Sequence, residues 1–167
     1  DYQKAWLQVY KKQKEELEIF RPRGIELRIF PQSFYSRWWT SYAKGFARAL
    51  KKEAGKFNLI HIHELWHYPH FAAYRIARKK NIPYIITPHG CLEPWALNFK
   101  ALKKRIYLAL IQKKILKEAS ALQAITPEEA ENIRKVGVNT KTVLIPNGIN
   151  FKEFQRTFCR KILEKQY

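Results

Sequence analysis

Polar side chains that could do chemistry follow two of the buried apolar segments of this sequence. His63 and Glu64 come directly after Asn58–Ile62, and the next such segment ends in Thr87-Pro88-His89-Gly90. Gly90 permits backbone geometry that other residues resist, so the chain can approach a ligand closely there. A histidine on such a turn can hydrogen-bond a hydroxyl group or stabilise charge near a leaving phosphate. Taken alone, however, His89 is better explained as a residue that caps the next helix or pairs with a carboxylate.

The segment from His63 to His67 matches H-E-x-x-H, the pattern of zinc metalloproteases. In those enzymes both histidines lie one turn apart on a continuous helix. Here the match begins at the end of a predicted strand, and Pro69 disfavours a helical conformation at Tyr68. We also expect His61 and His63, which alternate along the strand, to face opposite sides and so to stay apart. We therefore predict neither a metal site nor a bound cofactor.

The net charge of +18 favours anionic partners. One alternative is a basic nucleic-acid-binding module, in which Trp38, Trp39 and Trp66 would stack on bases. No RRM, KH or helix-turn-helix pattern accompanies the charge, so we expect no specific nucleic acid.

The long helix predicted over 102–119 is apolar all round in its middle, with lysines at both ends. We expect it to be buried mid-length, and peripheral contact of its ends with an anionic membrane is the minority reading.

Two periodicities alternate along the chain. Apolar runs predict strands over 25–30, 57–62, 83–87, 121–126 and 142–145, and helical spacing predicts helices over 42–54, 69–80, 102–119 and 128–136. The last helix has a capping box of Thr126 and Glu129 and a terminating Gly137. Alternation of this kind predicts an α/β, Rossmann-like fold, a mostly parallel sheet with helices on both faces. Another amphipathic helix is expected over 3–18.

In parallel sheets the ligand crevice lies outside the carboxyl ends of the strands. Four polar groups follow predicted strands and are expected to collect at that edge: His61–Glu64, His89–Glu93, Thr126–Glu128 and Pro146–Gly148. Asn147-Gly148 is also a common surface turn, so the pattern by itself does not require a functional role.

Taken in order, these segments resemble the N-terminal domain of family 4 glycosyltransferases, which have the GT-B fold. The stretches that carry the resemblance are Leu59–Trp66, Ile82–Trp95, Ala121–Thr126 with Glu129, and Ile145–Asn150. The match is close over 58–150 and looser over 24–57. We therefore expect a family-4-like domain over 24–150, an unassigned helical segment over 1–23, and the start of a linker or C-terminal domain over 151–167.

The resemblance implies an enzyme that transfers a hexosyl group from a nucleotide-sugar to a saccharide or lipid-linked acceptor. It implies retention at the anomeric carbon without a metal ion, as in polysaccharide or cell-envelope glycan synthesis. By this resemblance His89 would reach the donor sugar and Gly90 would shape its loop. His63, Glu64, Trp66 and Glu93 would line the acceptor cleft, and Asn147 and Gly148 would mark the crossing into a second domain.

The sequence departs from the family pattern in two respects. No G-x-G-x-x-G or P-loop pattern is present, and a donor-binding C-terminal domain is not visible after residue 150. We therefore expect the chain to be an acceptor-side fragment that is inactive alone; an inert remnant of a truncated gene is the third reading. Cys91 and Cys159 have no motif spacing, which fits a reducing compartment. The expected location is cytoplasmic, and peripheral contact at the inner face of the membrane is the secondary expectation.

Overall fold

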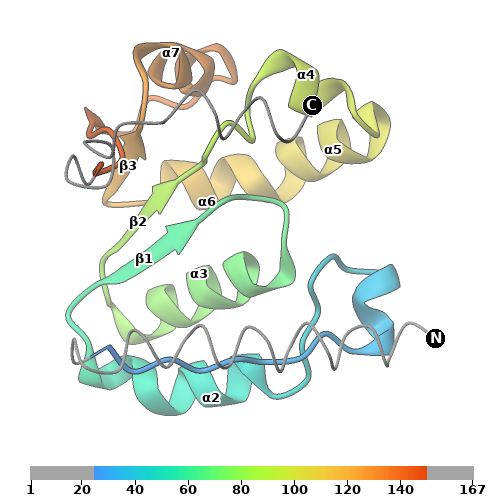
Figure 1. Cartoon of the computed structure of the whole chain (residues 1–167), viewed down its shortest axis with the longest axis vertical. Helices are drawn as coiled ribbons and strands as arrows, with labels where there is room; N and C mark the ends of the chain where they lie inside the picture. The colour runs from blue at the N-terminus through green and yellow to red at the C-terminus, as the bar shows by residue number, and fades with distance from the viewer. Residues whose placement is uncertain (1–24, 150–167) are drawn as a thin grey trace, which may run out of the picture.

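Four parallel strands form one sheet in the computed structural model, which describes residues 25–149 (Figure 1). The order of strands is β1-β2-β3-β4, and every neighbouring pair is parallel. The bounds are β1 (Ile60–His63), β2 (Tyr84–Thr87), β3 (Ala121–Ala124) and β4 (Thr142–Leu144). The predicted parallel, Rossmann-like α/β fold is confirmed. The helix expected over 3–18 and the segment 151–167 lie outside the described residues.

Helices alternate with these strands. They are α2 (Phe46–Glu53), α3 (Tyr68–Lys80), α4 (Pro94–Asn98), α5 (Ala101–Tyr107), the π-helical turn η4 (Leu108–Gln112), α6 (Lys113–Lys117) and α7 (Pro127–Lys135), with short 3₁₀ turns at Phe34–Arg37 and Ala54–Lys56. The predicted N-terminal cap and C-terminal glycine of α7 are both present. Thr126 Oγ1 accepts the Glu129 N–H at 3.1 Å, and Gly137 adopts a positive φ of 77° just past the helix.

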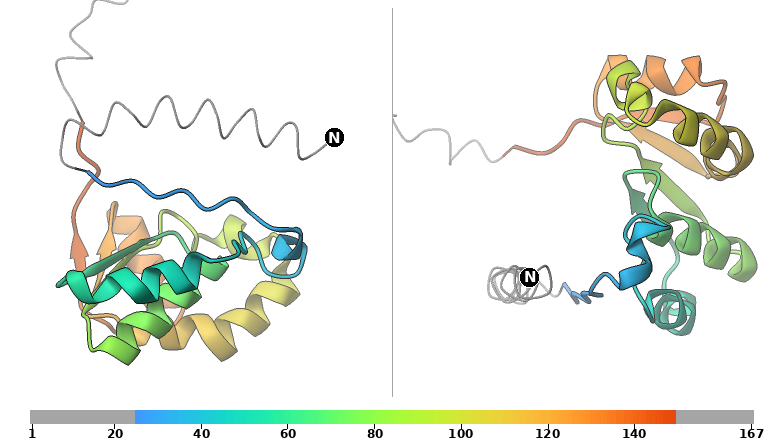
Figure 2. Two further views of the ribbon diagram at one scale, coloured as in Figure 1. Left: turned by 90° about the horizontal axis from the view of Figure 1, so that it is seen from below. Right: turned by 90° about the vertical axis from the view of Figure 1, so that its right-hand side faces the viewer.

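The hydrophobic core lies on one face of the sheet. Side chains that point to this face from the strands include Ile62, Ile86 and Leu122, and they cluster with residues of α3, α6 and α7. This arrangement follows from the topology, because right-handed crossovers between strands added in chain order place all their helices on the same side. Within residues 25–149, helices therefore cover one face, whereas the sequence predicted coverage of both (Figure 2).

The segment 25–30 is not a strand, so this part of the prediction is wrong. It runs beside α2 (Figure 1), where Phe30 packs edge-on against Phe46 with ring centroids 5.5 Å apart. Arg28 pairs with Glu26 at 2.6 Å and reaches Glu53 of α2 at 3.6 Å. Segment 25–30 stays outside the sheet because its charged and apolar side chains alternate. A strand inside a parallel sheet is normally apolar on both faces.

The helix predicted over 102–119 is also different in detail. It is interrupted at η4, where Gln112 is buried, and its middle is not enclosed. Leu102, Ile106 and Leu110 are 74%, 52% and 72% exposed, whereas Ile115 and Leu116 of α6 belong to the core. The expectation of burial mid-length is therefore wrong, because the side chains buried in the core lie toward the C-terminal end of the predicted helix, in α6. Within residues 25–149, no helix has the length and apolarity needed to cross a membrane.

Candidate functional site

Two histidines meet at the carboxyl ends of β1 and β2. His63 is the last residue of β1 and pairs in register with Thr87, and His89 follows two residues after Thr87. Nδ1 of His63 lies 2.9 Å from Nε2 of His89, and the two rings are stacked with centroids 5.2 Å apart. Burial, and then the neighbouring His89, lower the pKa of His63. His63 therefore favours its neutral form. In the contact between the two rings one nitrogen donates to the other, and each ring keeps a second nitrogen that can bind a hydroxyl group.

The turn that carries His89 has an unusual backbone. His89 and Gly90 both adopt positive φ angles, of 52° and 73°. A side chain at position 90 would place its Cβ 3.1 Å from Oε1 of Glu93, closer than a Cβ normally comes to another atom. Glycine is therefore favoured here for its conformation, and a larger residue would also require the Glu93 side chain to move. A positive φ at a residue other than glycine is uncommon and occurs often at functional sites.

Glu129, which lies in α7 after β3, holds the His89–Gly90 turn in place. Its side chain is buried, and Oε1 accepts the N–H of Gly90 at 2.7 Å. Oε2 accepts the N–H of Ile125 at 2.8 Å. The carboxylate sits in the first turn of α7, where a negative charge is favourable. The sequence identified Glu129 as a member of a capping box but not as the anchor of the His89–Gly90 turn.

A second polar network crosses the sheet on the face opposite the helices. His61 Nε2 lies 2.8 Å from Thr87 Oγ1, which donates to Gln123 Oε1 at 3.1 Å. Gln123 Nε2 in turn donates to the carbonyl of Ile145 at 2.9 Å. Because the single hydroxyl hydrogen of Thr87 points to Gln123, His61 must donate from Nε2. The pKa of His61 is lowered, first by burial and then by His63 and His89.

The expectation that His61 and His63 face opposite sides is wrong. Their ring centroids are 4.1 Å apart, because residues two positions apart on a strand point to the same face. The conclusion that His63 and His67 share no helix is correct, since α3 begins at Tyr68 and both Glu64 and Trp66 have positive φ angles. Over residues 25–149, no three His, Cys, Asp or Glu side chains are grouped so that they could hold a metal ion.

The other predicted site residues are divided between this edge and its surroundings. Glu93 lies against Gly90 and accepts a hydrogen bond from the Trp95 indole. Glu64 is exposed next to His63, and its backbone N–H donates to the carbonyl of Thr87 at 2.8 Å. The indole of Trp66 turns toward α5, where it lies 6.2 Å from the ring of Tyr107 and beneath the Lys104 ammonium.

Asn147 and Gly148 are exposed after β4. β3 separates this strand from β2, so the residues that follow β4 begin roughly 10 Å from the His89 turn. No hydrogen bond joins either residue to the histidine pair within the described part of the chain. The structure thus brings together His63, His89, Gly90 and Glu93, with Glu64 at their side, and leaves Trp66, Asn147 and Gly148 apart from them.

The fold and this edge define a class: a Rossmann-like domain whose polar residues gather at the carboxyl ends of parallel strands, where such domains bind ligands. A family model narrows the class, because the glycosyl transferase 4-like domain matches residues 10–148. The chain therefore belongs to the glycosyl transferase 4-like family, whose domain is the N-terminal part of family 4 enzymes. No curated protein matches the sequence significantly. The match begins inside segment 1–23, which the sequence analysis left unassigned.

Proposed function

We propose that this chain supplies the acceptor side of a transferase that moves a hexosyl group from a nucleotide-sugar to a saccharide or lipid-linked acceptor. Polysaccharide or cell-envelope glycan synthesis is the proposed setting. The observation that carries the proposal is the His89–Gly90 turn at the end of β2. Its histidine is paired with His63 at 2.9 Å, and its backbone is held by Glu129 at 2.7 Å. A rigid, partly exposed imidazole at this edge is suited to orient a sugar.

The proposed chemistry retains the configuration of the anomeric carbon and needs no metal ion. The bond from the anomeric carbon to the phosphate oxygen breaks, and the acceptor oxygen bonds to the same face of that carbon. The proton of the acceptor hydroxyl passes to the departing phosphate. His89 hydrogen-bonds the donor sugar while charge develops on its ring, and Gly90 keeps the backbone close to it. Glu64 and Glu93 accept hydrogen bonds from acceptor hydroxyls.

The proposed division of labour assigns the nucleotide-sugar mainly to a C-terminal, donor-binding domain. The family match to the N-terminal part of family 4 enzymes supports this division. The sequence also contains no glycine-rich pattern of the kind that binds phosphate groups, which agrees with a donor site elsewhere. We propose that Asn147 and Gly148, which follow β4, lie where the chain crosses toward that domain, and that Trp66 borders the acceptor side.

Transfer assays test this function directly. A panel of nucleotide-hexoses is incubated with saccharide and lipid-linked acceptors, using the chain alone and the chain joined to a family 4 donor-binding domain. We expect product only from the joined protein, with the anomeric configuration retained by NMR and with full activity in EDTA. An inverted product or loss of activity in EDTA would refute the mechanism. Saturable, salt-resistant binding of a nucleotide-sugar to the chain alone would refute the division of labour.

We further propose peripheral contact with an anionic membrane at the cytoplasmic face. Support comes from α4 and α5, where large apolar side chains are exposed among lysines: Trp95 and Phe99 are 71% and 64% exposed, close in sequence to Leu102 and Ile106. Lys100 and Lys103 are exposed on the same stretch and complement anionic headgroups. Sedimentation with vesicles tests the proposal. We expect binding to vesicles containing phosphatidylserine and not to neutral ones, and a Leu102→Ser/Ile106→Ser variant should bind less.

A further inference from the structure

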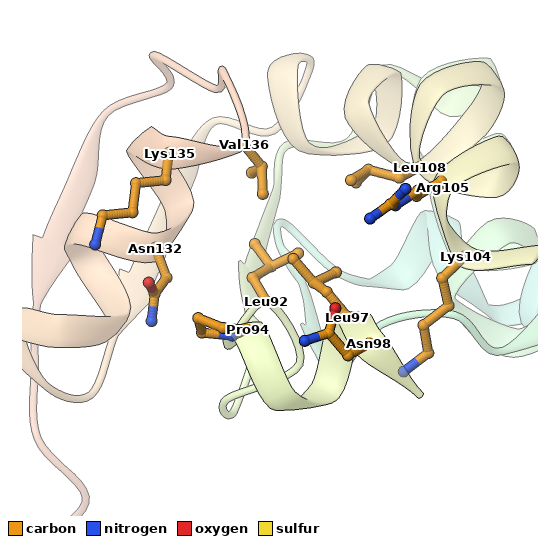
Figure 3. A pocket seen from close by; sticks show the side chains of 10 residues that line it. All are labelled: Leu92, Pro94, Leu97, Asn98, Lys104, Arg105, Leu108, Asn132, Lys135 and Val136. Carbon is orange, nitrogen blue, oxygen red and sulfur yellow. The ribbon is translucent and has the colours of Figure 1, made fainter. Parts of the chain in front are cut away.

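A cavity of about 360 Å³ lies between α4, α5 and α7, separate from the histidine pair (Figure 3). Its apolar wall is built from Leu92, Leu97, Leu108 and Val136, with Pro94 at the edge, and Figure 3 shows these side chains converging on the same space. The volume falls within the range of roughly 300–1,000 Å³ that is usual for small-molecule sites. None of the residues that the sequence predicted for catalysis or acceptor binding lines it.

The polar residues of this cavity are all cationic or neutral. Lys104, Arg105 and Lys135 contribute the cations and Asn98 and Asn132 the amides, while no carboxylate of residues 25–149 lines the space. Two of the cations are already engaged: Lys135 pairs with Glu131 at 2.8 Å, and the Lys104 ammonium donates to the Ala96 carbonyl. Arg105 has no salt bridge and no side-chain hydrogen bond within residues 25–149. Figure 3 shows its guanidinium directed toward the cavity from α5.

We propose that this cavity binds an anionic amphiphile, a hydrocarbon chain that ends in a phosphate. The chain lies on Leu92, Leu97, Leu108 and Val136, and the phosphate binds the guanidinium of Arg105, with the Asn98 amide within the same lining. Apolar walls recognise the chain by removing it from water. A guanidinium suits the other end, because its fork of donors matches two phosphate oxygens at once.

The residues that line this cavity do not suit a sugar or a nucleotide, the ligands proposed for the site around His63 and His89. A sugar presents hydroxyl groups on most sides and needs both donors and acceptors around it, whereas this cavity offers leucines, a valine and a proline on its apolar wall. A free nucleotide would bring several charges, and among the cations of this lining in residues 25–149 only Arg105 has neither a salt bridge nor a side-chain hydrogen bond. A molecule with one apolar end and one anionic end satisfies both halves of the lining. The site goes beyond the proposed transfer reaction and does not depend on it.

Calorimetry with dodecyl phosphate, kept below its critical micelle concentration, tests the proposal on the complete chain. Inorganic phosphate supplies the head alone, and dodecyl maltoside supplies the same hydrocarbon chain with a neutral head. We expect one-to-one binding of dodecyl phosphate with a dissociation constant about ten-fold or more below that of either control, since both halves contribute. Equal affinity for dodecyl maltoside would overturn the role of the anion. Equal affinity for inorganic phosphate would overturn the role of the apolar wall.

Three variants locate the binding. Arg105→Gln should weaken dodecyl phosphate binding about ten-fold or more. Arg48→Gln, on the exposed surface of α2, removes the same charge and should leave binding unchanged. Val136→Phe should reduce binding by filling the cavity, and methyl NMR of Leu92, Leu97 and Leu108 reports the site even if that variant is unstable. Equal loss in both arginine variants, or methyl shifts elsewhere, would overturn the proposal. Binding to phosphatidylserine vesicles without binding of monomeric dodecyl phosphate would do so as well, in favour of a membrane surface.

Discussion

The backbone N–H of Gly90 donates to the buried carboxylate of Glu129 at 2.7 Å, although the two residues are 39 positions apart. The other oxygen of that carboxylate accepts the N–H of Ile125 at 2.8 Å. One side chain thus ties the turn after β2 to the end of β3. Since His89 precedes Gly90, Glu129 acts on the histidine through the backbone and is best described as a positioning residue.

A glutamine at position 129 tests this anchor. Glu129→Gln keeps the shape of the side chain but replaces one of two acceptor oxygens by an NH₂ group, which would face a backbone N–H. We expect the free energy of unfolding to fall by about 1–3 kcal/mol, the cost of leaving a buried donor unsatisfied. Urea denaturation measures this loss. Glu131→Gln on the same helix removes only an exposed pair with Lys135 and should leave stability unchanged; an equal loss there would contradict the anchoring role.

A second prediction concerns the backbone at Gly90. Gly90→Ala forces an L side chain into a φ of 73° and sets its Cβ 3.1 Å from Glu93. We expect a loss of about 1–2 kcal/mol or more in the free energy of unfolding. Gly148→Ala is the matched control, because its Cβ would meet no atom within 4 Å and its φ is not positive. Thermal denaturation of both variants checks the difference, and similar melting temperatures would show that the turn relaxes without strain.

The role of His89 is tested by kinetics in the protein joined to a donor-binding domain. His89→Ala should lower kcat by roughly 10²-fold with little change in acceptor KM, if the imidazole acts mainly in the transition state. Arg48→Ala is the control, since this side chain is exposed on α2 and has no assigned part in the proposed site. An unchanged kcat in a folded His89→Ala protein would assign His89 a structural role only.

The pH dependence of stability follows from His70. Burial, and then its neighbours His67 and His63, lower the pKa of His70 from 6.5 to about 4, and its buried Nδ1 has no hydrogen-bond partner among residues 25–149. The unfolded state therefore binds the proton first. Stability should be level above pH 6.5 and should fall between pH 6.5 and 4, by roughly 3 kcal/mol in all.

Urea denaturation at several pH values measures this slope. His70→Phe removes the titrating group and should flatten the slope between pH 6.5 and 4. It should not abolish the slope, because the pKa values of His61 and His63 are lowered in the same direction. An unchanged slope in His70→Phe would show that His70 is solvated before it takes up its proton.

Local patterns predicted much of the fold correctly. Apolar runs between helical periods indicated four of the five proposed strands, and Thr126 and Gly137 marked the ends of α7. These signals are local, since they depend on neighbours within one turn or one strand. The prediction failed for 25–30, whose sequence has alternating apolar residues but also Glu26 and Arg28, which form an ion pair beside α2. An alternating pattern shows that a segment has two faces; it does not show what each face will meet.

The sequence by itself thus determined the parallel α/β class and the edge at which His63, His89 and Glu93 would gather. Only the tertiary structure decided which of these residues touch. The contact between His63 and His89 depends on the register of β1 against β2, and the contact between Gly90 and Glu129 depends on the position of β3. The cavity beside Arg105 likewise exists because the fold brings residues of α4, α5 and α7 around one space. Such contacts join residues tens of positions apart, and their geometry is set by packing of the whole domain, which no local pattern encodes.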